Sequence, residues 1–216
     1  MPSITLSDSI PTGSWCLYYH NPADTKWTPD SYQMVGTVKT WGEFFAVTKA
    51  MEDVSVQQGM LFWMRDGVPP LYENHANIKG GCYSLRVNRS RATHYFNQYV
   101  IASLLGAVVT DSGNQIQGVS ISPKRIAEKN QSFNVIKIWN KDCTKFCKPE
   151  QLVRLDNIQQ CSEIVYTPHI QKKLWESEFL LSLIDLQSIS SQKVVGTTTF
   201  MTPFSRLRSF VFRKKL

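Results

Sequence analysis

The chain has 216 residues, 42% of them hydrophobic, with a formal net charge of +7 and a pI near 9.2. This length suits one domain with a substantial core, or two small domains at most. The sequence has no apolar run of about 18 residues and does not open on a basic start with an apolar core, so neither a membrane span nor a signal peptide is expected. The excess of positive charge favours an anionic partner, and nucleic acid is the usual one.

Aromatic residues make up 12% of the chain. Exposed rings that stack bases, combined with cations that hold phosphates, are typical of proteins that bind nucleic acid. Most of these rings must nevertheless pack in the core.

The first third of the chain predicts strands separated by a polar loop. A compact apolar stretch predicts a strand at 15–19, and Asn, Asp and Pro residues predict a loop at 21–30. That loop carries Trp27, which is unusual for a polar segment. A second strand is expected at 31–38, and apolar residues at helical spacing predict a helix over 41–54. Core packing explains much of the stripe that Trp41 and Phe45 form on this helix.

The rest of the chain mixes strands and helices. In chain order we expect a strand at 60–65, a loop at 68–81, a strand at 82–87, a helix at 91–109, a strand pair at 118–122 and 133–139 around a basic loop at 123–132, a helix at 149–161, a strand at 162–168, a helix at 170–187 and a last strand at 208–212. No crossover pattern repeats, which favours an antiparallel sheet with helices on one face, an α+β domain. Residues 1–14 are polar and predict a mobile tail, followed by a single domain over 15–216 with an insertion at 170–190.

Tyr72 and Glu73 are neighbours in the loop GVPPLYENHANIKGG. Guanine presents two adjacent donors on its Watson–Crick edge, and a carboxylate accepts both as a bidentate pair. A flat base also needs an aromatic face on each side, and methylation at N7 makes the base a cation that such rings attract. Tyr72 is one candidate ring and Trp27 the other. The alternative is a loop aromatic beside a solvated carboxylate.

Three cations in the basic loop, Lys124, Arg125 and Lys129, are candidates for binding phosphates near this base. A charge run in a hairpin loop is more commonly a solvated surface, and this alternative stays open.

Neither a metal site nor a catalytic site is expected. The five cysteines are an odd, sparse set that indicates reduced thiols. A zinc site could draw on Cys143, Cys147, Cys161 and His169, but their spacing is not that of paired two-residue knuckles. No P-loop, paired-carboxylate motif or activated thiol is recognisable, so we expect no enzyme and no cofactor.

Several short motifs occur in an order that is more specific than any one of them. They are SWCLYY, DTKW ending at Trp27, TWGEFFAV, RDGVPPLYEN, KGG, LLG at 104–106 and KIW at 137–139. In this order the chain resembles the eukaryotic translation initiation factor 4E family, which binds the 7-methylguanosine cap of messenger RNA. The resemblance runs from about Trp15 to Trp139 and is weaker at 149–168 and 208–212.

The resemblance implies a curved antiparallel sheet, cupped on the cap side, with about three helices behind it. It implies these roles: base stacking by Trp27 and Tyr72, guanine recognition by Glu73, methyl contact by Trp139, phosphate binding by Lys124, Arg125 and Lys129, and a partner face at Trp41, Phe45 and Gly106. The implied partners are capped mRNA with its first nucleotides and a helical peptide of a scaffold factor or binding protein.

The chain departs from the family pattern at several positions. Tyr72 replaces the usual tryptophan, and Cys82 replaces the arginine that follows the double glycine. Val135 stands where a lysine is expected, and Phe45 where the family has a partner-binding tryptophan. The insertion at 170–190 is hypothesised to contact the first transcribed nucleotides. Such divergence is compatible with a protist or viral origin.

The sequence therefore predicts a cytoplasmic, monomeric, non-enzymatic protein that binds capped mRNA and recruits a scaffold in translation initiation. For a viral protein the compartment would be the host cytoplasm. One alternative is a cap-binding repressor of translation, which the residue at Phe45 makes credible. Another is an adaptor that has lost cap binding, and a third is an enzyme that acts on the cap, for which no metal-binding carboxylates or cofactor loop are found.

Overall fold

The computed structural model describes residues 4–51, 53–109, 115–145, 148–153 and 164–170. Seven strands form one sheet in the order β2-β1-β3-β5-β6-β4-β7, and every neighbouring pair is antiparallel. The strands are β1 (Trp15–His20), β2 (Tyr32–Val38), β3 (Met60–Arg65), β4 (Gly81–Asn88), β5 (Ile116–Ile126), β6 (Gln131–Asn140) and β7 (Val165–Pro168). The α-helices are α1 (Trp41–Ala50), α2 (Asp53–Gln58) and α3 (Ala92–Leu104), and short 3-10 turns η1 to η4 occur at Pro29–Ser31, Arg89–Arg91, Ala127–Lys129 and Pro149–Gln151. The predicted α+β class is confirmed.

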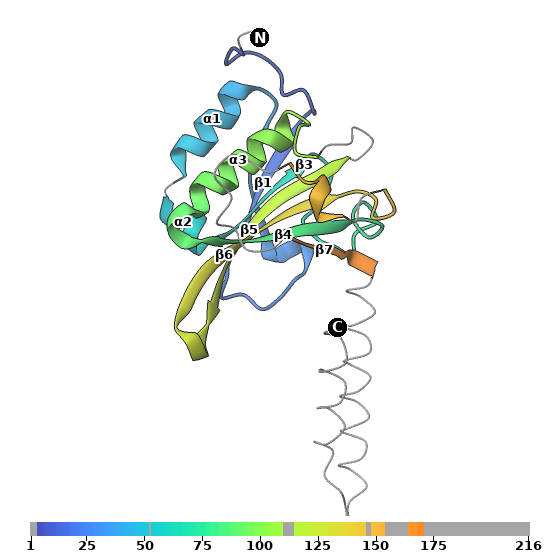
Figure 1. Cartoon of the computed structure of the whole chain (residues 1–216). Helices are drawn as coiled ribbons and strands as arrows, with labels where there is room; N and C mark the ends of the chain where they lie inside the picture. The colour runs from blue at the N-terminus through green and yellow to red at the C-terminus, as the bar shows by residue number, and fades with distance from the viewer. Residues whose placement is uncertain (1–3, 52, 110–114, 146–147, 154–163, 171–216) are drawn as a thin grey trace, which may run out of the picture. The chain divides into compact units, whose positions relative to one another are not determined.

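The helices pack on one face of the sheet, and the loop between β1 and β2 projects on the other side (Figure 1). Alternate strand residues point to opposite faces, so one set of side chains enters the helix-side core. That set includes Leu17, Leu61, Trp63, Tyr83, Leu85, Val119, Ile121, Ile136 and Ile138. The other set faces away from the helices and forms a smaller cluster of Met60, Phe62, Met64, Val68 and Trp139.

The predicted helix over 41–54 is two helices. A capping box starts α1, because the Thr40 hydroxyl accepts from the Glu43 N–H at 3.3 Å and the Glu43 carboxylate accepts from the Thr40 N–H at 3.2 Å. The helix α1 ends at Ala50, and the backbone of the next residue, Met51, is extended. The helix predicted at 91–109 also ends early, at Leu104, because Gly106 adopts the left-handed conformation with φ 71°.

The basic loop predicted at 123–132 is mostly strand. β5 continues to Ile126, β6 begins at Gln131, and the turn between them places Asn130 in the left-handed region. Lys124 and Arg125 therefore lie in β5. Neither face of this hairpin end is buried, so the sequence has no hydrophobic alternation there to reveal the strands.

The segment predicted as a mobile tail instead packs along α1 and α3 in its described part. The N–H of Ile10 donates to the Lys39 carbonyl at 2.9 Å, and the N–H of Gly42 donates to the Leu6 carbonyl at 2.7 Å. The Ile10 side chain is buried, and the Thr12 hydroxyl donates to the end of α3 at 2.8 Å. These contacts hold residues 6–12 against the domain.

Several predictions fall mainly outside the described residues. Of the helix predicted at 149–161 only a 3-10 turn and the two residues after it are described, whereas the strand predicted at 162–168 is present as β7. The insertion at 170–190 beyond Ile170, and the last strand at 208–212, are not described. A single domain over 15–216 stays a prediction. Within the described segments, no helix combines the length and apolarity that crossing a bilayer requires.

Candidate functional site

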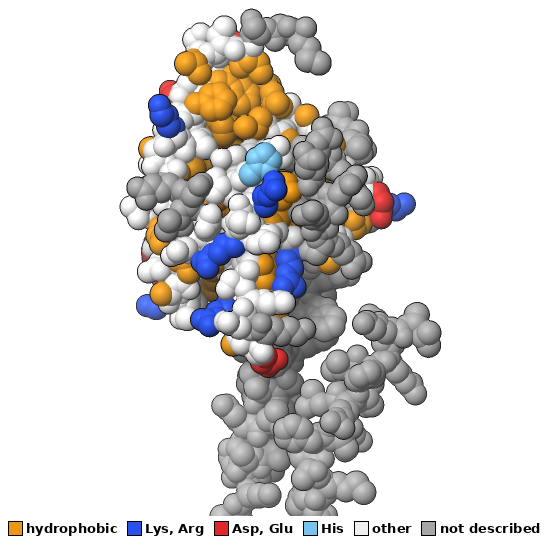
Figure 2. Space-filling model, turned by 60° about the vertical axis from the view of Figure 1, so that its left-hand side comes forward, with side chains coloured by type: hydrophobic (Ala, Val, Ile, Leu, Met, Phe, Trp, Pro, Cys, Tyr) orange, Lys and Arg blue, Asp and Glu red, His pale blue; other side chains and the backbone are white. Residues whose placement is uncertain are grey.

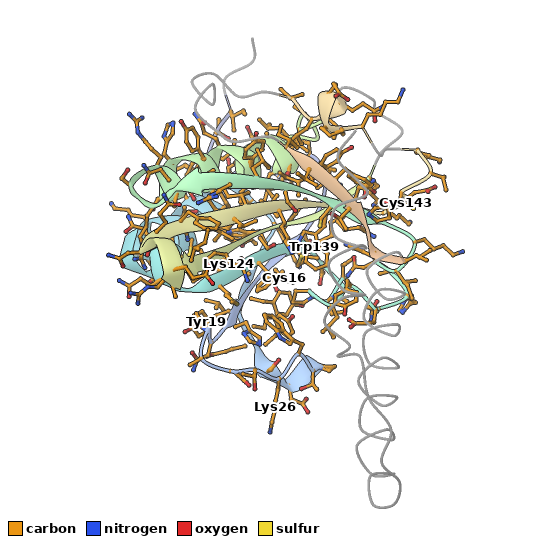
Figure 3. The ribbon with its side chains drawn as sticks, turned by 60° about the horizontal axis from the view of Figure 1, so that its bottom comes forward. Cys16, Tyr19, Lys26, Lys124, Trp139 and Cys143 are labelled. Carbon is orange, nitrogen blue, oxygen red and sulfur yellow. The ribbon has the colours of Figure 1, made fainter. Side chains whose placement is uncertain are left out.

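A cavity of about 440 Å³ lies on the face of the sheet that the helices leave uncovered. Its lining includes the rings of Trp27, Tyr32, Phe62, Tyr72 and Trp139, the carboxylate of Glu73, and the side chains of Lys124 and Lys137. Figure 3 labels Lys124 and Trp139, which come from the neighbouring strands β5 and β6, and Lys26 on the loop that carries Trp27. The structure thus brings the two predicted stacking rings, the predicted carboxylate, Trp139 and Lys124 to one cavity.

Trp27 is 51% exposed, and a buried histidine supports it from one side. Its ring stacks on His20 with the centroids 4.2 Å apart and the planes within 7° of parallel. His20 is held in turn, because its Nε2 donates to the Lys26 carbonyl at 2.9 Å. The side chains of Asn21 and Asp24 accept backbone N–H groups of the same loop at 3.0 and 2.8 Å. The indole is therefore backed on one face, in a loop with a fixed path.

Hydrogen bonds of the Asn77 side chain stabilise the loop that carries Tyr72 and Glu73. The buried Asn77 amide donates to the carbonyls of Pro69 and Leu71, both at 2.8 Å. The Asn77 carbonyl accepts from Nδ1 of His169 at 2.7 Å, and the Tyr72 ring lies 6.2 Å from the His169 ring. A buried histidine thus lies near each candidate stacking ring, stacked on Trp27 and tilted against Tyr72. The sequence assigns neither histidine to the support of a ring: it does not single out His20, and it suggests His169 only as a zinc ligand.

The two glycines that end this loop, Gly80 and Gly81, allow Asn140 and Tyr166 to lie very close to the loop backbone. A Cβ on Gly80 would lie 1.9 Å from the Asn140 carbonyl oxygen, and one on Gly81 would lie 2.3 Å from the Tyr166 hydroxyl. Backbone and side chains of β6 and β7 thus leave no space for a larger residue. The glycines let the loop return directly into β4, next to the cavity.

Trp139 forms part of the cavity floor. It is 6% exposed, and its indole Nε1 donates to the Ser120 hydroxyl at 2.9 Å. Its ring also lies 5.1 Å from His169 and 6.5 Å from Phe62, in edge-to-face arrangements. Trp139 therefore belongs partly to the smaller hydrophobic cluster.

Tyr32 is a cavity residue that sequence reasoning did not single out. Its ring packs edge-on against Phe62 at 5.3 Å and against His20 at 4.9 Å. Burial raises the pKa of Tyr32, and the negative charge of Glu73 raises it further. The phenol therefore stays protonated at neutral pH. Within the described part of the chain, the Glu73 carboxylate accepts no hydrogen bond and joins no ion pair.

Strand alternation decides which of the predicted phosphate-binding cations reach the cavity. Lys124 lines the cavity, whereas Arg125 does not, because consecutive residues of β5 point to opposite faces. The Arg125 guanidinium instead donates to the Asn130 side chain at 3.4 Å. The side chain of Lys129 lies outside the description. Lys137 also lines the cavity, and its position two residues before Trp139 on β6 is the signal that could have revealed it.

The geometry suits a flat ring with an anionic tail. Aromatic faces are available for the ring, a carboxylate for hydrogen-bond donors on its edge, and two lysines for negative charge.

Comparison with known proteins identifies the family. The family model named eukaryotic initiation factor 4E matches residues 12–197. The chain belongs to this family. A eukaryotic translation initiation factor 4E from Candida albicans is 25% identical over 140 residues, which span 60% of this chain and 63% of that protein.

Solved structures share the fold at lower identity. Caenorhabditis elegans eIF4E-3, solved in complex with the 4E-binding protein Mextli, has a TM-score of 0.59 and 16% identity, over 76% of this chain and 94% of that one. Ascaris suum eIF4E-3, solved with an m7G cap, has a TM-score of 0.52 and 16% identity, over 73% of this chain and 97% of that one. The curved antiparallel sheet expected for the initiation factor 4E family is thus confirmed.

The predicted partner face of this initiation factor 4E family member needs one correction. Trp41 is 3% exposed and belongs to the core, so its side chain offers no surface to a partner. Phe45 lies one helical turn further along α1 and is 45% exposed, and its ring centroid is 6.1 Å from that of Trp41. Gly106 is also exposed, at the end of α3. Hydrophobic side chains gather at the top of the molecule in Figure 2, near the N-terminal residues. Leu6 and Phe45 are exposed hydrophobic residues, and Leu6 lies next to α1 because its carbonyl accepts the Gly42 N–H at 2.7 Å.

The alternative zinc set is not assembled by the described residues. Cys147 and Cys161 lie outside them, and His169 is buried against Asn77. In the ranges that the structure covers, no three His, Cys, Asp or Glu side chains converge as metal ligands would.

Proposed function

We propose that this protein binds the 7-methylguanosine cap of messenger RNA. The single observation that carries the proposal is the convergence of Trp27, Tyr72 and Glu73 on one cavity in a chain of the initiation factor 4E family. The Ascaris suum relative, which was solved with an m7G cap, supports the same ligand.

In the proposed complex the methylated base lies between Trp27 and Tyr72. The base is cationic, so each ring attracts it through its π face as well as by stacking, a term of about 1–2 kcal/mol when desolvated. Glu73 accepts the N1–H and the amino group of guanine, which unmethylated and methylated guanine both present. Trp139 borders the cavity floor and is the proposed contact of the methyl group.

Lys124 and Lys137 are the proposed phosphate ligands. Both line the cavity, and the triphosphate bridge of a cap is the anion that would meet them there. Lys137 is paired with Ser84, the residue two positions after Cys82 on β4. A lysine on the adjacent strand thus offsets the missing arginine at Cys82.

We further propose that the protein has no enzymatic activity and acts in cytoplasmic translation initiation. Its exposed Phe45 would bind a helical peptide of a scaffold factor. The complex of Caenorhabditis elegans eIF4E-3 with a 4E-binding protein supports a partner of this class. A repressor would bind the cap equally well and differ in its partner, whereas an adaptor without cap binding would leave the cavity unused.

Isothermal titration with 7-methyl-GTP tests the proposal. Base–aromatic stacking contributes about 1–3 kcal/mol, so Trp27→Leu should weaken binding at least about fivefold, and Trp27→Phe, which keeps a ring, should weaken it less. Equal affinities for the intact protein and Trp27→Leu would contradict the proposed stacking. No binding to the intact protein would favour the adaptor.

A further inference from the structure

The face that carries the cavity continues along β6 towards the β5–β6 turn. Three rows of paired residues cross β5, β6 and β4 there, and we call them the first, second and third rows. The first row is Ser120–Lys137–Ser84, the second is Ser122–Val135–Arg86, and the third is Lys124–Phe133–Asn88. The first row adjoins Trp139, and Lys124 of the third row still lines the cavity, so the rows are continuous with it.

Strand alternation directs these side chains away from the helices. The residues between them on the same strands, such as Ile121, Ile136 and Leu85, are buried in the helix-side core. None of the nine residues in the three rows is acidic, and Lys137, Arg86 and Lys124 each carry a positive charge. This surface therefore favours a chain of negative charges that leads out of the cavity.

Arg86 and Phe133 form a layered pair on this surface. The Arg86 guanidinium lies over the Phe133 ring, 3.7 Å from its centroid. The guanidinium also donates to the Gln131 side-chain oxygen at 3.3 Å, which fixes its orientation. Arg86 is exposed, whereas Phe133 is partly buried beneath it. The result is a flat, cationic platform that is organised before any ligand arrives.

We propose that Arg86, supported by Phe133, binds the first nucleotide that follows the cap. The inference rests on the proposed function and names a ligand position beyond the cap nucleotide itself. Bases of single-stranded RNA stack on arginine planes and aromatic rings, and lysines hold the adjacent phosphates. Here the base stacks on the guanidinium, and Lys124, which is paired with Phe133, binds the neighbouring phosphate.

The spacing of the rows agrees with this order along the RNA. Successive residues on one face of a strand are about 6.7 Å apart, so Phe133 lies about 13 Å along β6 from Lys137. A triphosphate bridge that leaves the cavity past Lys137 and Lys124 delivers the next nucleotide to the second and third rows. The site needs no residue from the predicted insertion at 170–190.

The test compares two ligands that share a methylated base and a triphosphate. 7-Methyl-GTP ends at the triphosphate, and 7-methyl-GpppA adds one adenosine. The readout is the ratio of their dissociation constants, measured by titration for each variant. Arg86→Gln should weaken binding of 7-methyl-GpppA about fivefold relative to binding of 7-methyl-GTP. This factor corresponds to the lower limit of the stacking free energy of one base, about 1 kcal/mol. Phe133→Leu, which keeps an apolar residue in the sheet but removes the platform, should act in the same direction.

Arg91→Gln is the matched control, because it removes an equal charge from an exposed arginine just after β4. It should leave the ratio unchanged. A ratio unaffected by Arg86→Gln, while the intact protein still binds 7-methyl-GTP, would overturn this inference and leave the proposed function intact. Failure of the intact protein to bind 7-methyl-GTP would overturn both.

Discussion

Replacing Glu73 by glutamine isolates the recognition of the guanine edge. Glutamine has nearly the same shape, but one carboxylate oxygen becomes an amino group. That group carries donors and would face a donor of guanine, so one hydrogen bond is lost and the other loses its charge assistance. Glu73 accepts no hydrogen bond from the described residues, so the substitution should leave the fold unchanged.

The expected loss of binding free energy depends on how exposed Glu73 is at the cavity. Hydrogen bonds to charged groups contribute about 1.5–3 kcal/mol. Glu73 is exposed, and water competes for its oxygens, so the lower part of this range applies. A loss of about 1.5–2 kcal/mol corresponds to a dissociation constant about 10–30 times higher.

Titration with 7-methyl-GTP at fixed ionic strength measures this change. Glu150→Gln is the control, because it removes the same charge from an exposed carboxylate that does not line the cavity. The control should bind as the intact protein does. If Glu73→Gln also bound within twofold of the intact protein, the assignment of the guanine edge to Glu73 would be wrong.

Three further predictions test other parts of the account. Lys124→Gln should weaken binding of 7-methyl-GTP several-fold, and the effect should be larger at low salt. Arg125→Gln should leave binding unchanged, because Arg125 lies on the opposite face of β5. Equal losses of affinity for the two variants would contradict the assignment of Lys124 and Arg125 to opposite faces. The pKa of Tyr32 is raised above its ordinary value of 10.0, so its contribution to the free energy of unfolding is complete below pH 10 and is lost as pH rises further. In urea unfolding, the free energy of unfolding should fall less above pH 10 for Tyr32→Phe than for the intact protein. Thr40→Ala removes the cap of α1 and should lower the free energy of unfolding by about 1 kcal/mol; an unchanged urea midpoint would exclude that role.

The sequence predicts most of the sheet because one face of each strand is buried. An unbroken apolar run locates β3 and alternation of apolar residues locates β4, and turn residues separate the two strands. The end of the β5–β6 hairpin is missed because neither face is buried there, so no alternation marks it. The break between α1 and α2 is missed because the apolar spacing continues through Met51, whose backbone leaves the helix.

The candidate site is only partly predictable from the sequence. Trp27, Tyr72 and Glu73 stand out because rings and a carboxylate in polar loops need an explanation. Lys137 and Arg86 do not stand out, because a lysine or arginine on a strand is ordinary until strand pairing shows which face it occupies. The family resemblance implies a place on the partner face for Trp41, whereas its helical spacing also fits core packing, and the structure places it in the core.

The most direct measurement is tryptophan fluorescence during titration with 7-methyl-GTP and, separately, with GTP. Trp27 is half exposed and lines the cavity. Of the other described tryptophans, Trp15, Trp41 and Trp63 are buried outside the cavity and only Trp139 borders its floor, so a stacked ligand should act mainly on Trp27. We expect strong quenching by 7-methyl-GTP at concentrations where GTP has little effect, because only the methylated base is a cation. Equal quenching by both nucleotides, or none by either, would contradict the claim that this cavity binds the methylated cap.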